Sequence, residues 1–158
     1  MKKIGVVGLG NMGMGIAKNL IKNEFDTTGF DLRDSCLKEL KDSGGNVASS
    51  VEDIGKNCDI VFIMVMNGNQ VKDVVAKLSP GLKNDGTIIV TATITPEEVR
   101  SAYEIAKKNN IKMIDSPVSG GLQGAHEGTL TLMSAADKNV FNNCKDILKS
   151  ISKDIFHV

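Results

Sequence analysis

The residues best suited to chemistry in this sequence are glycines, and they gather in two short stretches. The first, Gly8-Leu9-Gly10-Asn11-Met12-Gly13, has the spacing GxGxxG. In such a stretch the first glycine makes a tight turn, the second lets a pyrophosphate approach the backbone, and the third lets a helix pack closely on a strand. Free N–H groups at the start of that helix then hold the anion. The stretch therefore predicts a dinucleotide site built on Gly8, Gly10 and Gly13.

An acidic residue stands where such a site needs one. Asp31 ends the second predicted strand, 21 residues after Gly10. A carboxylate there accepts hydrogen bonds from both ribose hydroxyls and repels a 2′-phosphate, which favours NAD over NADP. Arg33 stands two residues further on, either to neutralise a 2′-phosphate or as a solvated charge at the start of the next helix. A glycine-rich turn without ligand and a methyltransferase-type nucleotide site remain as alternatives for the first stretch.

The second stretch, Ser119-Gly120-Gly121, opens a glycine-rich segment that we expect to be a loop over residues 119–128. Consecutive glycines after a strand expose backbone N–H groups that can form an anion-binding nest. The Ser119 hydroxyl adds a group able to bind a carboxylate or a substrate hydroxyl. At the carboxyl edge of a sheet this segment would lie beside a nicotinamide. An ordinary surface loop is the alternative.

The elements that must position these residues alternate between strands and helices. Short, β-branched apolar runs predict strands covered on both faces, at residues 4–7, 27–30, 60–65, 87–90 and 111–114. Amphipathic helical segments lie between them, around residues 12–21, 71–78 and 99–106. Thr95-Pro96-Glu97-Glu98 opens the third of these helices with a capping box. We therefore predict one α/β domain over residues 1–158, of the Rossmann type: a doubly wound, mostly parallel sheet with helices on both faces.

Past Asp115 the pattern changes. The alternation of residues 129–134 predicts a half-exposed edge strand. A helix with Val140, Cys144, Ile147 and Ile151 inward follows, and then a closing strand near residues 155–158.

Composition argues against several classes of function. The 19 Lys+Arg balance 19 Asp+Glu, so the chain offers no electrostatic surface for nucleic acid or anionic lipid. Cys36, Cys58 and Cys144 are scattered and form no CxxC pair, which favours a reducing cytoplasm and argues against a zinc site. No apolar run reaches the length of a membrane span, and the N-terminus lacks the apolar region of a signal peptide. We expect a soluble cytoplasmic protein without a metal.

On these motifs the chain resembles the cofactor domain of the β-hydroxyacid dehydrogenases, relatives of 3-hydroxyisobutyrate dehydrogenase and 6-phosphogluconate dehydrogenase. The resemblance covers residues 3–158 and is carried by the stretches 8–13, 91–96 and 115–133. Residues 65–70, Val-Met-Asn-Gly-Asn-Gln, look closest to the L-threonate dehydrogenase branch.

The resemblance implies roles for individual residues. Backbone contacts to the pyrophosphate would come from Leu9, Asn11 and Met12, and Asp31 would bind the adenosine ribose. The remaining cofactor neighbours would be Val65, Met66, Gln70 and, near the nicotinamide, Thr93. The carboxylate end of the substrate would be held by Ser119, Gly120 and Gly121.

The family's general acid/base is a lysine in a segment that follows the strand resembling residues 155–158, and an all-helical domain that closes over the substrate and forms the dimer comes after it. The resemblance places both beyond Val158, so we expect no catalytic residue in this chain. His126 is expected to face solvent, and His157 to be structural.

The leading hypothesis is the cofactor domain of an NAD-dependent oxidoreductase that moves hydride between nicotinamide and a small hydroxy acid of the L-threonate or 3-hydroxyisobutyrate type. The intact enzyme would be a homo-oligomer. The alternatives are a non-catalytic NAD-binding or regulatory module and an NADP-dependent, carbonyl- or imine-reducing relative.

Overall fold

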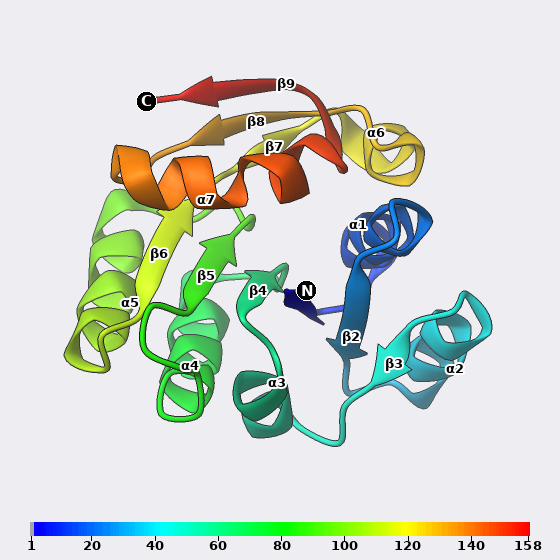
Figure 1. Cartoon of the computed structure of the whole chain (residues 1–158), viewed down its shortest axis with the longest axis horizontal. Helices are drawn as coiled ribbons and strands as arrows, with labels where there is room; N and C mark the ends of the chain where they lie inside the picture. Colours follow the sequence, from blue (N-terminus) through cyan, green and yellow to red (C-terminus); the bar gives the residue numbers. More distant parts are fainter. Residues whose placement is uncertain (1) are drawn as a thin grey trace.

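The computed structural model describes residues 2–158, which form two β-sheets and seven helices (Figure 1). The large sheet has six parallel strands in the order β3-β2-β1-β4-β5-β6. Its strands are β1 (Lys3–Val7), β2 (Asp26–Phe30), β3 (Asn46–Val47), β4 (Ile60–Ile63), β5 (Thr87–Val90) and β6 (Lys112–Asp115). The helices between them are α1 (Asn11–Lys22), α2 (Asp34–Asp42), α3 (Val51–Asn57), α4 (Gly68–Leu78) and α5 (Pro96–Lys108).

The predicted doubly wound parallel sheet is confirmed, and its burial explains the continuous apolar runs. Every residue of β4 and β5 is buried, because helices cover both faces of the sheet. On one face α1 and α7 pack on side chains such as Ile4 and Phe62. On the other face α3, α4 and α5 pack on side chains such as Val61 and Ile88. Figure 1 shows these two layers of helices on opposite sides of the sheet.

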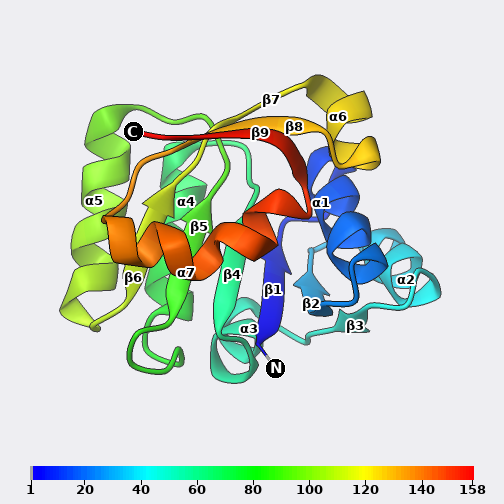
Figure 2. The ribbon, with the colours of Figure 1, turned by 45° about the horizontal axis from the view of Figure 1, so that its top comes forward.

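A second, three-stranded sheet with the order β7-β8-β9 was not anticipated from the sequence. Its strands are β7 (Val118–Ser119), β8 (Leu130–Ser134) and β9 (Ser152–His157), and the helices α6 (Gly121–Glu127) and α7 (Lys138–Lys149) connect them. β7 pairs antiparallel with β8, whereas β8 and β9 are parallel and α7 connects them. Figure 2 shows this sheet running across the top of the molecule, above the carboxyl end of β1.

Two expectations for this region are wrong. Residues 119–128 are not a loop throughout, because residues 121–127 form α6, and His126 therefore lies exposed on a helix. The glycines bound the helix instead: Gly120 turns the chain into it with φ 127°, and Gly128 ends it in the left-handed region with φ 72°.

The strand predicted at the edge, β8, is the central strand of its sheet. Buried and exposed side chains alternate along β8, because one face packs on the core, where Leu130 and Leu132 are buried, while Met133 faces outward.

Other elements differ in smaller ways. The strand predicted over residues 60–65 ends at Ile63. The capping box of α5 is confirmed, because the Glu98 N–H donates to Thr95 Oγ1 at 3.2 Å and the Thr95 N–H donates to Glu98 Oε1 at 3.0 Å. Tyr103, on the same helix, is 41% exposed although it falls within the predicted amphipathic segment 99–106. Within residues 2–158, no helix is both long enough and apolar enough to cross a membrane.

Candidate functional site

The first glycine stretch joins the end of β1 to the start of α1, and two of its glycines admit no side chain. Gly8 has φ 96°, and a Cβ there would collide with the carbonyl oxygen of Met64. A Cβ on Gly13 would collide with the carbonyl oxygen of Gly8. The loop therefore keeps α1 close against the carboxyl ends of β1 and β4, as the GxGxxG spacing predicts.

The N-terminus of α1 is left open. Its N-cap is Gly10, and no side chain accepts a hydrogen bond from the first turn. The first helical hydrogen bond runs from the Met14 N–H to the Gly10 oxygen at 2.7 Å. The N–H groups of Asn11, Met12 and Gly13 come before it and therefore have no acceptor within the helix. Aligned peptide dipoles add a partial positive charge at this end. The first turn can therefore hold an anion.

A pocket of about 240 Å³ opens beside this helix end. It lies where the strand order reverses between β1 and β4, the place at which open α/β sheets bind ligands. Three segments contribute its lining, namely the first glycine stretch (residues 8–13, called the phosphate loop from here on), the residues after β4 and the start of α6: Gly10, Asn11, Met12, Gly13, Met64, Val65, Met66 and Leu122. The structure thus brings Val65 and Met66 next to the loop.

Asp31 lies directly after β2 and is held by four donors. Its Oδ2 accepts the Leu9 N–H at 2.8 Å and Arg33 Nη2 at 3.2 Å. Its Oδ1 accepts the Arg33 N–H at 2.9 Å and Arg33 Nε at 3.0 Å. Burial alone would raise the pKa of Asp31, but these hydrogen bonds outweigh it and hold the pKa below its usual value. Asp31 is therefore an ionised acceptor.

These bonds change the role of one residue. Because the Leu9 N–H donates to Asp31, it is not free for the pyrophosphate contact that the resemblance implies. Leu9 instead ties the acidic residue to the phosphate loop, and its side chain is buried in the core.

Gln70 and Thr93 lie outside the pocket lining. Gln70 Oε1 accepts the Met66 N–H at 2.8 Å, so Gln70 braces the connection after β4 that carries Val65 and Met66. Thr93 is exposed after β5. The buried neighbour Thr91, which the sequence did not single out, donates its hydroxyl to the Ile63 oxygen at 2.9 Å and fixes the end of β4.

The second glycine stretch stands at the end of β7. Ser119 is exposed, Gly120 and Gly121 both have positive φ, and Leu122 reaches the pocket beside the phosphate loop. The two glycine stretches thus approach one another through α1 and α6. The backbones of these two helices touch at Gly15 of α1, where a Cβ would lie 2.8 Å from the carbonyl carbon of Ala125 in α6.

A buried side chain that the sequence analysis missed holds α1 and α6 together. Asn19 is only 5% exposed, and its Nδ2 donates to the oxygens of Gly15 at 2.9 Å, Ala125 at 2.7 Å and His126 at 3.0 Å. The last two oxygens belong to the final turn of α6, whose carbonyls lack helical partners. A polar residue between the apolar positions Ala17 and Leu20 was the available signal.

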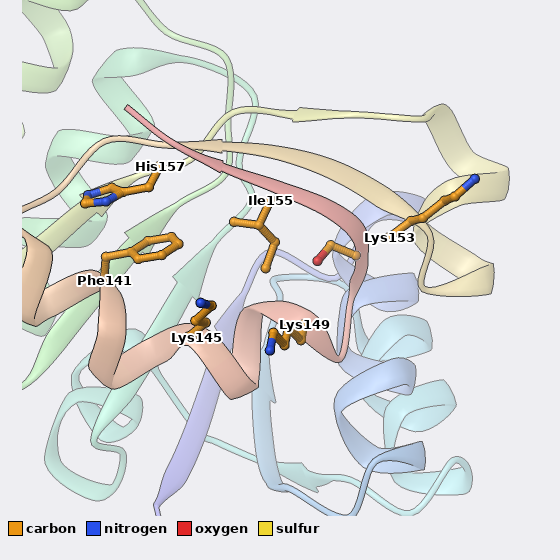
Figure 3. Close-up of a pocket in the computed structure, with 7 residues that line it drawn as sticks. Phe141, Lys145, Lys149, Lys153, Ile155 and His157 are labelled. Atoms are coloured by element: carbon orange, nitrogen blue, oxygen red, sulfur yellow. The ribbon is translucent and has the colours of Figure 1, made fainter.

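A second hollow, of about 320 Å³, lies between α7 and β9 (Figure 3). It is larger, but it shares no lining residue with the pocket at the phosphate loop. Phe141 and His157 stack there with ring centroids 4.2 Å apart, and His157 Nε2 lies 2.7 Å from the Ala136 oxygen. The His157 ring is therefore fixed by a stacking contact and a hydrogen bond.

Known proteins with this sequence pattern and fold were found by comparison. The profile of the NAD binding domain of 6-phosphogluconate dehydrogenase matches residues 3–158. The "probable 3-hydroxyisobutyrate dehydrogenase, mitochondrial" of Dictyostelium discoideum is 36% identical over 159 residues, which cover 99% of this chain and 50% of that protein. L-threonate dehydrogenase of Cupriavidus necator is 30% identical over 164 residues, covering 99% of this chain and 54% of that protein.

Among solved structures, 3-hydroxyisobutyrate dehydrogenase of Mycobacterium tuberculosis with L-serine matches with a TM-score of 0.96 and 26% identity. The match covers 99% of this chain and 54% of that one. The chain therefore spans about half the length of the relatives that it matches.

Proposed function

Since the chain belongs to the family of NAD-binding domains of 6-phosphogluconate dehydrogenase, we propose that it is the cofactor domain of an oxidoreductase that acts on a small hydroxy acid. The observation that carries this proposal is the open N-terminus of α1 beside the pocket between β1 and β4. An acceptor for ribose hydroxyls, Asp31, stands at the end of the neighbouring strand β2.

The residues present fit the dinucleotide. The N–H groups of Asn11, Met12 and Gly13 would hold the pyrophosphate, and Asp31 would accept the adenosine ribose hydroxyls. Val65 and Met66 would border the cofactor, with Gln70 bracing them and Thr93 on the nicotinamide side. The bound cofactor would supply the hydride acceptor, and the chain's own part is to bind and orient it.

For the substrate we propose a small hydroxy acid, of the L-threonate or 3-hydroxyisobutyrate type that two matched relatives are named for. Ser119, Gly120 and Gly121 would bind its carboxylate, because an exposed serine is followed directly by two glycines with free first-turn N–H groups at the start of α6. The acid/base lysine and the helical, dimer-forming domain that the resemblance places past Val158 stay predictions, as does the cytoplasmic location.

Calorimetric titration of the 158-residue chain with NAD⁺ and NADP⁺ tests the cofactor site. Asp31→Ala is expected to weaken NAD⁺ binding about tenfold or more, since hydrogen bonds to a charged group are each worth roughly 1.5–3 kcal/mol. NADP⁺ binding should suffer less, because its 2′-phosphate gains nothing from a carboxylate. Asp42→Ala is the matched control, because Asp42 is exposed on α2 and pairs with the exposed Lys38 on the same helix. Equal losses for both cofactors would show that Asp31 does not read the ribose.

A second measurement tests where catalysis resides. The purified 158-residue chain, given NAD⁺ and L-threonate or 3-hydroxyisobutyrate, is expected to produce no steady increase in NADH absorbance. Sustained turnover by this chain would mean that its own residues supply the general base.

A further inference from the structure

Three of the eight residues that line the pocket at the phosphate loop are methionines. Met12 lies in the first turn of α1, and Met64 and Met66 follow β4. A methionine side chain is apolar and flexible, so it packs readily against a ligand. Its thioether sulfur can also be oxidised, which turns the side chain polar. The pocket therefore holds a reactive group that the proposed binding of NAD does not use.

The three methionines differ in how well an oxidant can reach them. Met66 is 90% exposed, whereas Met12 and Met64 are half-buried. The sulfur of Met64 also lies 3.5 Å from the hydroxyl oxygen of Thr91, a residue that is itself buried. A dissolved oxidant has to touch the sulfur, so Met66 is the methionine of the pocket that it meets first.

The main chain keeps Met66 at the pocket although its side chain is exposed. Its N–H donates to Gln70 Oε1 at 2.8 Å. Gln70 lies in the first turn of α4, where its own N–H donates to the capping side chain of Asn67 at 2.9 Å. Because the backbone of Met66 is thereby tied to the start of a helix, a chemical change in its side chain takes effect at the pocket.

A peroxide can oxidise this sulfur without any further reactant. A lone pair of the Met66 sulfur attacks one peroxide oxygen, an S–O bond forms and the O–O bond breaks. The second oxygen leaves with both electrons of the O–O bond and takes up the proton of the transferred hydroxyl, so hydrogen peroxide becomes water. The sulfur is oxidised by two electrons to a sulfoxide, which sulfoxide reductases return to the thioether.

A sulfoxide at Met66 would be unfavourable beside a bound ligand. The side chains that line the pocket, other than Asn11, are apolar and offer no hydrogen-bond donor. A ligand that fills the pocket takes water away from the sulfoxide oxygen and leaves it without a partner. Burying a polar oxygen in this way opposes binding.

We propose that Met66 is a site of oxidation by peroxides, that its sulfoxide weakens cofactor binding at this pocket, and that bound cofactor shields the thioether. Oxidation and cofactor binding then oppose each other, so the chain without cofactor is the form that is oxidised. This inference rests on the proposed function, because it takes the pocket as the place where NAD binds.

The first test follows oxidation residue by residue. The 158-residue chain is treated with hydrogen peroxide, digested and analysed by mass spectrometry, with and without NAD⁺. Met133 is the internal control, because it is 47% exposed on β8 and does not line the pocket. NAD⁺ at about ten times its dissociation constant leaves about a tenth of the chain free, so Met66 should oxidise about fivefold to tenfold more slowly. The rate at Met133 should stay the same.

The second test measures NAD⁺ binding by two variants before and after peroxide, with dithiothreitol added afterwards to reduce reversibly oxidised thiols. Met133→Leu keeps the methionine of the pocket rim, and its NAD⁺ binding should weaken about tenfold, since oxidation places an unpaired polar group against the ligand. Met66→Leu keeps the control methionine, and its affinity should not change on treatment. Methionine sulfoxide reductases A and B, one for each sulfoxide epimer, should restore the affinity of Met133→Leu.

Equal losses in the two variants, or no protection of Met66 by NAD⁺, would overturn the inference. If the untreated chain binds no NAD⁺, the proposed function fails together with it. If the untreated chain binds NAD⁺ and full oxidation of Met66 leaves that affinity unchanged, the inference fails alone.

Discussion

Replacing Asn19 by leucine should loosen the contact between α1 and α6, and the cost follows from the two hydrogen bonds that cross between these helices. Leucine has the same branching at Cγ but cannot donate, so the Ala125 and His126 oxygens lose the partner that they have in the native structure. The Gly15 oxygen keeps its bond within α1. A buried carbonyl without a partner costs about 1–3 kcal/mol. Because the His126 oxygen is only partly buried, we expect a total loss of about 2–4 kcal/mol in the free energy of unfolding.

Urea unfolding followed by far-UV circular dichroism measures this loss, since the chain has no tryptophan to report by fluorescence. For a chain of this size the melting temperature should fall by roughly 5–10 °C. Asn57→Leu is the matched control, because the exposed amide of Asn57 bonds only to Asp53 in its own helix, and it should cost less than about 1 kcal/mol.

The Asn19→Asp variant keeps the shape of asparagine but lacks its N–H donors, so it distinguishes the loss of hydrogen bonds from a change of shape. At neutral pH its carboxylate would face three carbonyl oxygens, so this variant should be less stable than Asn19→Leu. Such surroundings raise the pKa of the introduced carboxyl in the folded chain above its value in the unfolded chain. The variant therefore keeps its full stability below the pKa of the unfolded chain and loses it as the pH rises through the pKa of the folded chain. The aspartate variant should therefore recover relative to leucine near pH 4. A loss of unfolding free energy below about 1 kcal/mol in Asn19→Leu, or no recovery of Asn19→Asp near pH 4, would refute the conclusion that the Asn19 amide holds α1 and α6 together.

Two further predictions concern groups away from the cofactor. Burial raises the pKa of Asp115, so the ionised form of this side chain opposes folding. The Asp115→Asn variant should therefore be more stable than the parent chain at pH 7, and this difference should disappear below about pH 4. Thermal melts at both pH values measure it. Burial, with Asp59 and Asp26 nearby, raises the pKa of Cys58 to about 12, and burial also raises the pKa of Cys144, whereas Cys36 is half-buried. Mass spectrometry after iodoacetamide at pH 7.5 should therefore find Cys36 modified in the native chain and all three thiols modified in urea; rapid native labelling of Cys144 would contradict the burial argument.

The sequence was informative where local backbone geometry decides the structure. Gly8 and Gly13 could be assigned because a side chain at either position collides with a backbone oxygen, and the resulting GxGxxG spacing is visible without any tertiary contact. The strands β4 and β5 were recognised because helices cover both of their faces, which requires continuous apolar runs.

The parts that were missed depend on contacts between distant residues or on weak patterns. Asn19 meets Ala125 only in the folded chain, and no local rule relates the two. The bounds of α2 were not predicted, because its apolar stripe is short: Leu40 is its single buried residue, and Cys36 and Leu37 are only partly buried beside it. The helix α3 was missed because it has only seven residues, with Gly55 among them. The role of Leu9 was misjudged because its N–H lies beside Asp31, at a distance that sequence spacing does not reveal.

The reversal of strand order at β1 also bears on how the chain folds. Ile4 pairs with Thr27 on one side and with Ile60 on the other, so the chain closed by the second pairing is more than twice as long. Closing it costs roughly 0.8 kcal/mol more in loop entropy, which makes the β1–β4 junction slower to form than its neighbours. The pocket lies over this junction. A dinucleotide bound there, as we propose, would therefore stabilise only the chain in which this junction has formed.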